Sequence, residues 1–167
     1  MSFSDISKSL SDIERKVTKS NKIIAKGNDI NYKDAIKLGT KSQSICSTIR
    51  KGIKDYGNFN PSEDEAKKLL TQMTTVIDLT ETQLNSMVAN KAQFDKLKVG
   101  GLVKKNVEKT EVASKELSDT MVAKAPASIK ADAEALEKRR AAAFSKAVST
   151  FAGATGGEDE QLGEDSD

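Results

Sequence analysis

Residues 87–107 read MVANKAQFDKLKVGGLVKKNV and separate two long helical patterns. The segment combines Phe94, Leu97 and Val99 with the pair Gly100–Gly101, although a short polar loop would be enough to join two helices. Glycine allows the chain to reverse tightly without a Cβ clash. The three apolar side chains either plug one end of a bundle or complete an ordinary core, and the residues alone leave both interpretations open.

On both sides of this segment, apolar residues recur at steps of three and four, as on one face of a helix. The pattern predicts helices at about residues 3–24, 32–56, 61–88, 102–122 and 127–151. Asn60 is the predicted N-cap of the third helix, and Pro126 separates the last two because proline cannot continue a helix. We therefore expect an all-α fold in which residues 1–152 form a single antiparallel bundle of about five helices.

The composition excludes many classes of active site. The 167 residues include one cysteine, Cys46, and no histidine, so neither a Ser-His-Asp triad nor a zinc site of the usual His/Cys kind can form. The glycine-containing segments lack the Gly-Lys-Ser/Thr ending of a phosphate-binding loop. We expect no catalytic residues, no metal and no cofactor. Few aromatic residues and no nucleic-acid motif also predict that the protein does not bind nucleic acid.

Charge divides the chain into two parts. Residues 153–167 contain six of the 25 acidic residues and none of the 27 basic ones, so residues 1–152 carry a net charge of +8. The terminal segment is also rich in glycine and lacks periodicity, which predicts a disordered acidic tail. The basic body could attract anionic lipid head groups or wall polymers, although such lysine clusters are usually solvated faces.

No stretch is long and apolar enough for a membrane-spanning helix. The N-terminal sequence MSFSDISKSL lacks the apolar region of a signal peptide, so the sequence describes either a cytosolic protein or a mature domain without its leader.

The passage around the double glycine resembles the fungal hydrophobic surface-binding protein A family, which includes cell-wall galactomannoproteins. The matching positions are Lys91, Phe94, Asp95, Leu97, Val99, Gly100, Gly101 and Val103. Further along, Ala125–Pro126 and an alanine-rich final helix match the family's later passages. The resemblance implies a secreted or cell-wall protein whose helices enclose a long apolar cavity for fatty acids. It also favours the plug interpretation of Phe94, Leu97 and Val99.

If an acyl chain occupies such a cavity, inward-facing apolar residues should line it. The predicted lining is Ile13, Val17, Ile49, Met73, Ile77, Leu84, Leu117, Phe144 and Val148. Polar residues on otherwise apolar stripes are candidates for holding the head group. Gln43 and Ser47 are favoured because they lie four residues apart, on one face of the second helix. Ser20, Thr80 and Thr110 are further candidates, unless they bond back to their own helices.

Three functions compete at this stage. The first, which we favour, is a secreted binding protein that holds a long-chain fatty acid or related lipid and exists as a monomer or weak dimer. The second is a surface-active protein that adsorbs to hydrophobic surfaces or cell-wall polymers without a discrete ligand. The third is an intracellular helical adaptor. Co-purified lipid would indicate the first, and adsorption to hydrophobic beads without lipid the second.

Overall fold

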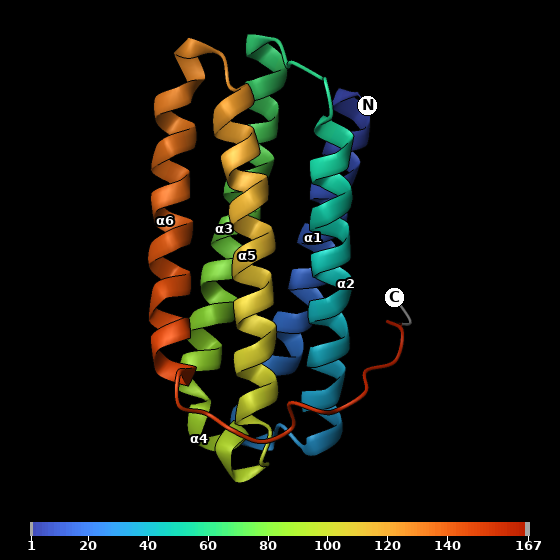
Figure 1. Ribbon diagram of the computed structural model, residues 1–167, viewed down its shortest axis with the longest axis vertical. Coiled ribbons are helices and arrows are strands. Elements are labelled where there is room, and N and C mark those ends of the chain that lie inside the picture. Colours follow the sequence, from blue (N-terminus) through green and yellow to red (C-terminus); the bar gives the residue numbers. More distant parts are fainter. Residues whose placement is uncertain (1, 166–167) are drawn as a thin grey trace.

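The structure is a computed structural model that describes residues 2–165, and these residues form helices and no strands. The helices follow one another as α1 Phe3–Ile24, η1 Gly27–Asp29, α2 Tyr32–Tyr56, α3 Glu63–Ala89, α4 Lys91–Lys96, α5 Gly100–Lys124 and α6 Ala127–Phe151 (Figure 1). The predicted all-α fold is therefore confirmed. Five helices are long, as expected, and the short helices η1 and α4 are additions that the periodicity did not predict.

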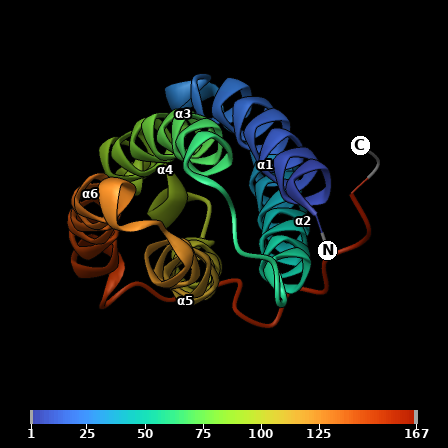
Figure 2. The ribbon, with the colours of Figure 1, turned by 90° about the horizontal axis from the view of Figure 1, so that it is seen from above.

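The five long helices form a closed ring in the order α1, α3, α6, α5, α2 (Figure 2). Each long helix packs against two neighbours, and the centre of the ring is the core. Long helices that are consecutive in the chain run antiparallel, but three pairs of ring neighbours run in the same direction: α1 with α3, α3 with α6, and α2 with α5 (Figure 1). Because α2 and α3 are not ring neighbours, residues 57–62 cross the upper end of the ring as drawn in Figure 1. The segment that contains α4 crosses the lower end.

Side-chain caps begin three of these helices: the Ser2 hydroxyl accepts from the N–H of Asp5 at α1, and reciprocal capping boxes begin α2 and α3. At α2, Asn31 Oδ1 accepts from the backbone N–H of Asp34 at 2.8 Å and the Asp34 carboxylate accepts from the N–H of Asn31 at 3.1 Å. Ser62 and Glu65 form the same reciprocal capping box at α3. The predicted cap at Asn60 is therefore wrong by two residues, because α3 begins at Glu63 and the Ser62 hydroxyl accepts from the N–H of Glu65.

Two apolar clusters follow one another along the ring axis. The upper core contains aliphatic residues, methionines and one tyrosine from all five long helices. Its buried members are Ile6, Leu10, Ile13, Val17, Ile45, Ile49, Tyr56, Leu69, Met73, Val76, Ile77, Ala113, Leu117, Met121 and Leu136. The lower core holds the three buried phenylalanines. Its buried members are Ile23, Ile24, Ile30, Ala35, Leu38, Leu84, Met87, Phe94, Val99, Leu102, Val103, Val107, Phe144, Ala147 and Phe151.

The three residues of the predicted plug lie in the segment that crosses the lower end of the ring. Phe94 and Val99 are completely buried in the lower core, while Leu97 is half-buried at its edge. The Phe94 ring lies 6.4 Å from the Phe151 ring, at an interplanar angle of 59°. Tilted aromatic pairs at this spacing are favourable beyond the area that they bury. The segment therefore closes the lower end of the ring with packed side chains.

The double glycine has a different role from the predicted one. The chain reverses at Lys98, whose φ is 61°, whereas Gly100 and Gly101 belong to the first turn of α5. A Cβ on Gly101 would overlap the Glu158 side chain, and one on Gly100 would lie 2.8 Å from Asp95 Oδ1. The pair is needed because two other segments of the chain approach α5 closely.

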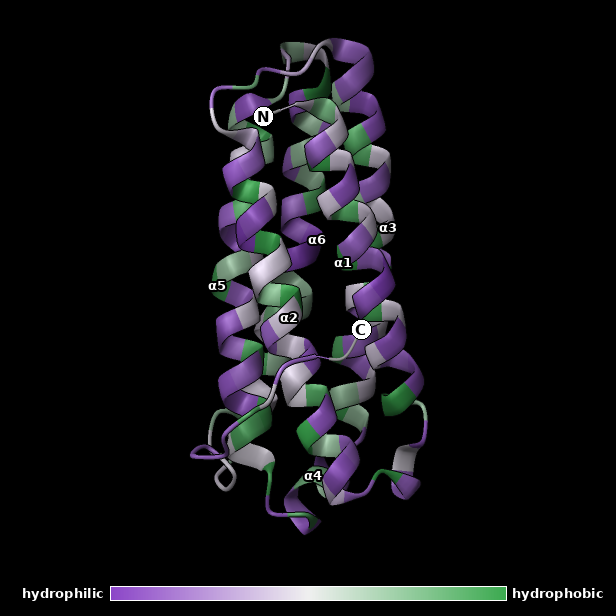
Figure 3. Cartoon of the chain, turned by 90° about the vertical axis from the view of Figure 1, so that its right-hand side faces the viewer, coloured by the Kyte–Doolittle hydropathy of each residue, from purple (hydrophilic) through white to green (hydrophobic). Residues whose placement is uncertain are grey.

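The tail contacts the bundle, whereas its composition predicted disorder. Residues 153–165 form no helix or strand and run across the lower parts of α5 and α2 (Figures 1 and 3). Ala154 and Leu162 pack against the lower core. The N–H of Leu102 donates to the carbonyl of Gly156 at 2.9 Å. Composition did not reveal these contacts, because they involve only two apolar side chains and the backbone of an otherwise polar segment.

Candidate functional site

Two small cavities lie inside the ring where the upper and lower cores meet. Each has a volume of about 20 Å³. Ile45, Gln83, Thr110 and Phe144 line both cavities, so the two voids adjoin along the axis of the ring. A volume of this size admits about one water molecule. The predicted interior cavity therefore exists as two voids, and the packed ring has no room for an acyl chain until its helices separate.

Most of the predicted acyl-chain lining is brought together at these voids. Ile13, Val17, Ile49, Met73, Ile77, Leu117 and Phe144 line the first cavity. Leu84 lines the second. Val148 lines neither, since it is half-buried at the edge of the lower core, four residues beyond Phe144. The inward stripes predicted for α1, α3 and α5 thus converge in space, while that of α6 turns away from the voids beyond Phe144.

The predicted head-group residues do not face the interior. Gln43 and Ser47 are exposed and line an outer groove of about 450 Å³ between α2 and α5, together with Arg50 and Lys109. The buried face of α2 instead includes Leu38, Ile45 and Ile49. The predicted stripe is wrong in the middle of α2, because its small and polar residues give no strong signal for which face is inside.

Two buried amides that the sequence analysis did not select face the second cavity. Gln83 on α3 and Asn106 on α5 are 8% and 7% exposed and both line this void. Neither side chain hydrogen-bonds to another residue in the described part of the chain. An amide that faces a void without a partner can bind a polar ligand atom or water, so these groups are the natural candidates. The signal available in the sequence was that Gln83 interrupts the otherwise apolar stripe of the third helix.

The hydroxyl candidates are partly satisfied by their own helices. Thr80 Oγ1 donates to the carbonyl of Val76, and Thr110 Oγ1 to that of Asn106, both at 2.8 Å. These bonds are the alternative that the sequence analysis left open for them. Ser20 is buried at 1% exposure, and its hydroxyl has no hydrogen-bond partner among the described residues. It does not line either interior cavity.

A buried cation lies behind Phe144, between α5 and α6. The Arg140 guanidinium donates to both carboxylate oxygens of Glu137, at 2.6 and 2.8 Å, and to Glu111 and Ser114. Burial lowers the pKa of Arg140, but these hydrogen bonds outweigh burial and raise the pKa above its ordinary value. With two carboxylates and one cation, the cluster has a net charge of −1. It therefore does not attract a carboxylate ligand, and it holds the helices together.

The described residues contain no cluster of acidic or sulfur ligands that could hold a metal ion. Among the described helices, none has the length and apolar character needed to cross a membrane. Cys46 is half-buried, with its Sγ 3.5 Å from Thr110 Oγ1 in the α2–α5 seam.

The fold is shared with solved lipid complexes. Afmp4p in complex with palmitic acid superimposes with a TM-score of 0.83 at 22% identity, over 90% of this chain and 99% of that one. Ligand binding domain 2 of the Penicillium marneffei MP1 protein, complexed with multiple arachidonic acids, gives 0.83 at 23% identity, over 92% and 97%. Domain 1 of MP1, complexed with arachidonic acids, gives 0.77 at 24% identity, over 86% and 94%. At these identities the likeness shows the fold.

Sequence comparison shows the family. No curated protein matches the chain. Residues 3–123, which cover α1 to α4 and most of α5, match the family described as hydrophobic surface binding protein A. That match includes the passage around the double glycine and most of the residues that line the two voids. The chain belongs to the hydrophobic surface binding protein A family.

Proposed function

We propose that this protein binds long-chain fatty acids or similar lipids inside the helix ring, and that its function is binding rather than catalysis. The observation that carries the proposal is the pair of adjoining voids at the centre of the ring, lined by apolar side chains and by an amide without a partner, Gln83. Proteins of the same fold have been solved in complex with palmitic acid and with arachidonic acids.

The energetics allow the ring to open around a ligand. Burying a methylene group is worth about 0.8 kcal/mol, so the roughly fourteen methylenes of a C16 chain contribute about 11 kcal/mol. Association costs on the order of 4 kcal/mol or more. The remaining free energy is available to separate helices that pack closely in the empty ring. The ligand therefore selects an expanded state of the bundle.

Gln83 is the residue that we assign to the head group. It lines both voids and is buried on the later part of α3, so a lipid whose polar end reaches the voids would meet its amide. The Arg140 cluster is already over-supplied with carboxylates, which leaves Gln83 and Asn106 as the amides that line the voids and can donate. This assignment replaces Gln43 and Ser47.

Surface adsorption is the second candidate. The family is described by hydrophobic surface binding, yet the large apolar side chains exposed on the described residues are Tyr32 and Val112, on different helices. These do not form an apolar patch, so adsorption also requires the ring to open. The same opening could therefore serve either function.

Native mass spectrometry of the purified protein titrated with palmitate tests the proposal. We expect a mass increase of one or two fatty acids. Gln83→Leu should weaken binding about three- to tenfold, since it removes one hydrogen bond to the ligand. Gln43→Leu is the matched control on the exposed face and should bind like the wild type. An unchanged mass at saturating palmitate, together with adsorption to hydrophobic beads, would support the second candidate instead.

We further propose a location outside the cell or in the cell wall, which the resemblance to cell-wall proteins supports. Fractionation of the source culture into medium, wall and cytosol tests it, and recovery from the cytosol alone would contradict it. Weak or absent self-association and the lack of nucleic-acid binding stay predictions.

A further inference from the structure

A polar groove runs along the outside of the ring between α2 and α5. Its first part, of about 450 Å³, is lined by hydroxyl and amide side chains, two cations and Cys46. A second hollow of about 510 Å³ shares Ser47 and Arg50 with the first, so the two adjoin. We call the two hollows together the α2–α5 groove. Both are within the size range of small-molecule sites, so the groove has room for a polar head group.

The groove is polar because of a stripe of residues on α2. Gln43, Ser47, Arg50 and Lys54 follow one another at steps of four, three and four residues, which places them on one face of the helix. From the other side, α5 contributes Lys109. An amide, a hydroxyl and three cations thus line one groove from two helices.

Five polar side chains in the groove have no partner among the described residues. Gln43, Ser47 and Asn106 form no side-chain hydrogen bond there, and Lys54 and Lys109 form no ion pair. Asn106 is also only 7% exposed, so its amide is largely withdrawn from solvent. Donors gathered in one concave surface can bind an acceptor-rich ligand.

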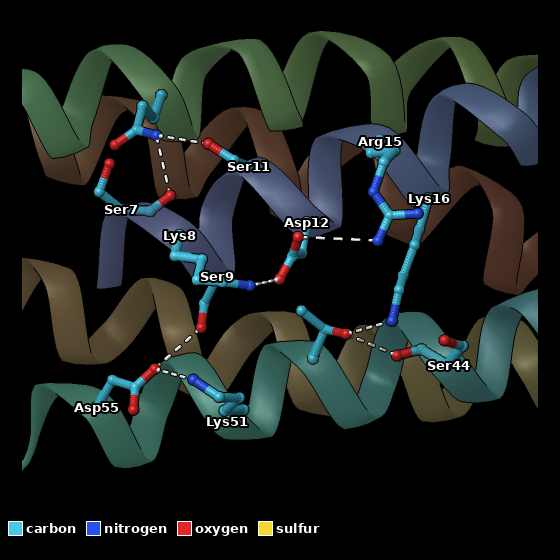
Figure 4. A network of polar contacts seen from close by, with 12 residues as sticks. Ser7, Lys8, Ser9, Ser11, Asp12, Arg15, Lys16, Ser44, Lys51 and Asp55 are labelled. Atoms are coloured by element: carbon cyan, nitrogen blue, oxygen red, sulfur yellow. Dashed lines mark hydrogen bonds and ion pairs between the residues drawn. The ribbon is translucent and has the colours of Figure 1, made fainter. Parts of the chain in front are cut away.

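The seam between α1 and α2 shows the opposite arrangement. Lys16 donates to Thr48 Oγ1 at 2.8 Å, and the Ser9 hydroxyl donates to Asp55 at 2.9 Å (Figure 4). The polar side chains of that seam bind one another and hold the two helices together. Those of the α2–α5 groove are open to a ligand.

The groove is positively charged. Arg50 pairs with Glu116 at 3.4 Å, but both side chains are more than half exposed, so the pair adds little stability and can be exchanged. Lys51 pairs with Asp55 at 2.9 Å. Four cations of the groove thus face two carboxylates, which gives a net charge of +2. This charge matches a phosphate monoester, which carries about −1.5 to −2 at pH 7. Arginine suits phosphate because its planar fork donates two parallel hydrogen bonds.

The groove adjoins the interior of the ring. Ser42 and Asn106 line both the groove and the second void. Gln83 also lines this void and is the residue that we assign to the polar end of a lipid. A lipid that lies across Ser42 and Asn106 would have its acyl chain in the opened ring and its head group in the groove. With a fatty acid, whose carboxylate ends the molecule at Gln83, the groove stays unoccupied.

We propose that the α2–α5 groove binds the phosphate of a single-chain phospholipid whose acyl chain occupies the ring. Arg50 and Lys109 bind the phosphate, and the ester carbonyl of the lipid accepts from Gln83. Gln43 and Ser47 share the groove with these cations and bind the glycerol hydroxyl. This inference rests on the proposed function and names a class of lipid within it. A soluble phosphate ester offers the same phosphate without the chain, so the test separates the two sources.

Isothermal titration calorimetry of the full chain with three probes tests the proposal, with the lipids kept below their micelle concentrations. Palmitate carries the chain, glycerol phosphate the head group, and palmitoyl lysophosphatidic acid both. Lysophosphatidic acid should bind about tenfold tighter than palmitate, which is the effect of one charge-assisted hydrogen bond. Glycerol phosphate should bind more weakly than either lipid, because it buries no acyl chain. If it binds as tightly as lysophosphatidic acid, the groove serves a soluble phosphate ester and its link to the ring is overturned.

Two double variants assign the effect to the groove. Arg50→Gln with Lys109→Gln should make lysophosphatidic acid bind no tighter than palmitate, whose own affinity should not change. Lys68→Gln with Lys130→Gln is the matched control, because it removes two exposed cations on α3 and α6 that have no ion pair among the described residues. This control should keep the tenfold difference. Equal losses in the two double variants would indicate a general attraction of charge and would overturn the site.

The same titrations separate this inference from the proposed function. If palmitate binds the wild type and lysophosphatidic acid binds no tighter, the groove assignment fails and the proposed function stands. If palmitate does not bind the wild type, the proposed function fails, and the groove assignment with it.

Discussion

The two ends of the helix ring are closed by different kinds of segment. At the upper end, residues 57–62 cross from α2 to α3, with Phe59 half-buried against the upper core and Pro61 buried beneath the crossing. At the lower end, α4 carries Phe94 into the ring and the tail adds a second layer outside it. The upper closure uses residues that adjoin the helices in sequence. The lower closure depends on segments that are far apart in the chain.

Because of this difference, the two ends should contribute differently to the stability of the ring. The upper core is a continuous aliphatic packing of the five long helices, so it maintains the ring. The lower core contains the three buried phenylalanines and is bounded by the crossing segment and the tail, which have fewer regular hydrogen bonds. Elements of this kind usually open at lower free energy than the helices around them. The upper end should therefore stay closed when the lower half rearranges.

The largest expected effect comes from removing the side chain that fills the lower end. Phe94→Ala should lower the free energy of unfolding by about 3–5 kcal/mol, because it leaves a cavity among fully buried neighbours. Hydrogen exchange should rise mainly in residues 90–103 and at the end of α6. Leu10→Ala is the upper counterpart, with an expected loss of about 2–5 kcal/mol, and should raise exchange in α1 and α3 instead. A uniform rise along all helices in both variants would contradict the division into two halves.

Substitutions at two glycines compare the same two ends and should change the free energy of unfolding by less. At Gly52, on the upper part of α2, an added Cβ would make an ordinary contact, 3.5 Å from Ser9 Cβ. Gly52→Ala should therefore raise the free energy of unfolding by about 0.5–1 kcal/mol, since alanine favours the helix. Gly101→Ala should gain less, because its Cβ forces the Glu158 side chain away from α5. Urea denaturation measures both changes, and an equal gain in the two variants would show that the tail does not rest on α5.

The smallest effect concerns pH at the lower end. Burial raises the pKa of Asp34, but its bonds with Lys26 and Asn31 outweigh burial and lower the pKa below the ordinary 3.8. A lowered folded-state pKa contributes stability above the unfolded value, and this stability is lost as pH falls through the folded value. Between pH 5 and pH 2, the wild type should lose up to about 1 kcal/mol more than Asp34→Asn, the worth of a helix cap. Urea denaturation of both proteins at each pH would detect this difference. An identical dependence of the free energy of unfolding on pH in the two proteins would refute the prediction.

The sequence was most informative where one helix face decides the structure. The periodicity located α1, α2 and α6, and it identified inward residues such as Ile13 and Met73, because apolar spacing reports directly which side is buried. It failed in the middle of α2, where lysine, serine and glutamine surround the buried face. Lys41 is buried there and pairs with Asp165 of the tail, whereas Gln43 is exposed.

Features that depend on contacts distant in sequence could not be read from periodicity. The double glycine looked like a turn, yet its small size serves the approach of a tail more than fifty residues away. Gln83 is one polar residue on an apolar stripe, and only the ring places it beside Asn106 across a void. Composition likewise describes the tail as acidic, without saying which basic residue its carboxylates reach.

The shared direction of α2 and α5 brings two positive helix ends close to the acidic tail. Parallel helices present their N-terminal ends together, and each such end carries roughly half a positive elementary charge from its aligned peptide dipoles. Both ends lie at the bottom of the ring, where Glu158 reaches the first turn of α5 and Glu160 accepts from the hydroxyl of Tyr32, the first residue of α2. Side by side, the two dipoles repel each other. The negative tail relieves that repulsion, so lifting it would weaken the seam electrostatically as well as uncover it.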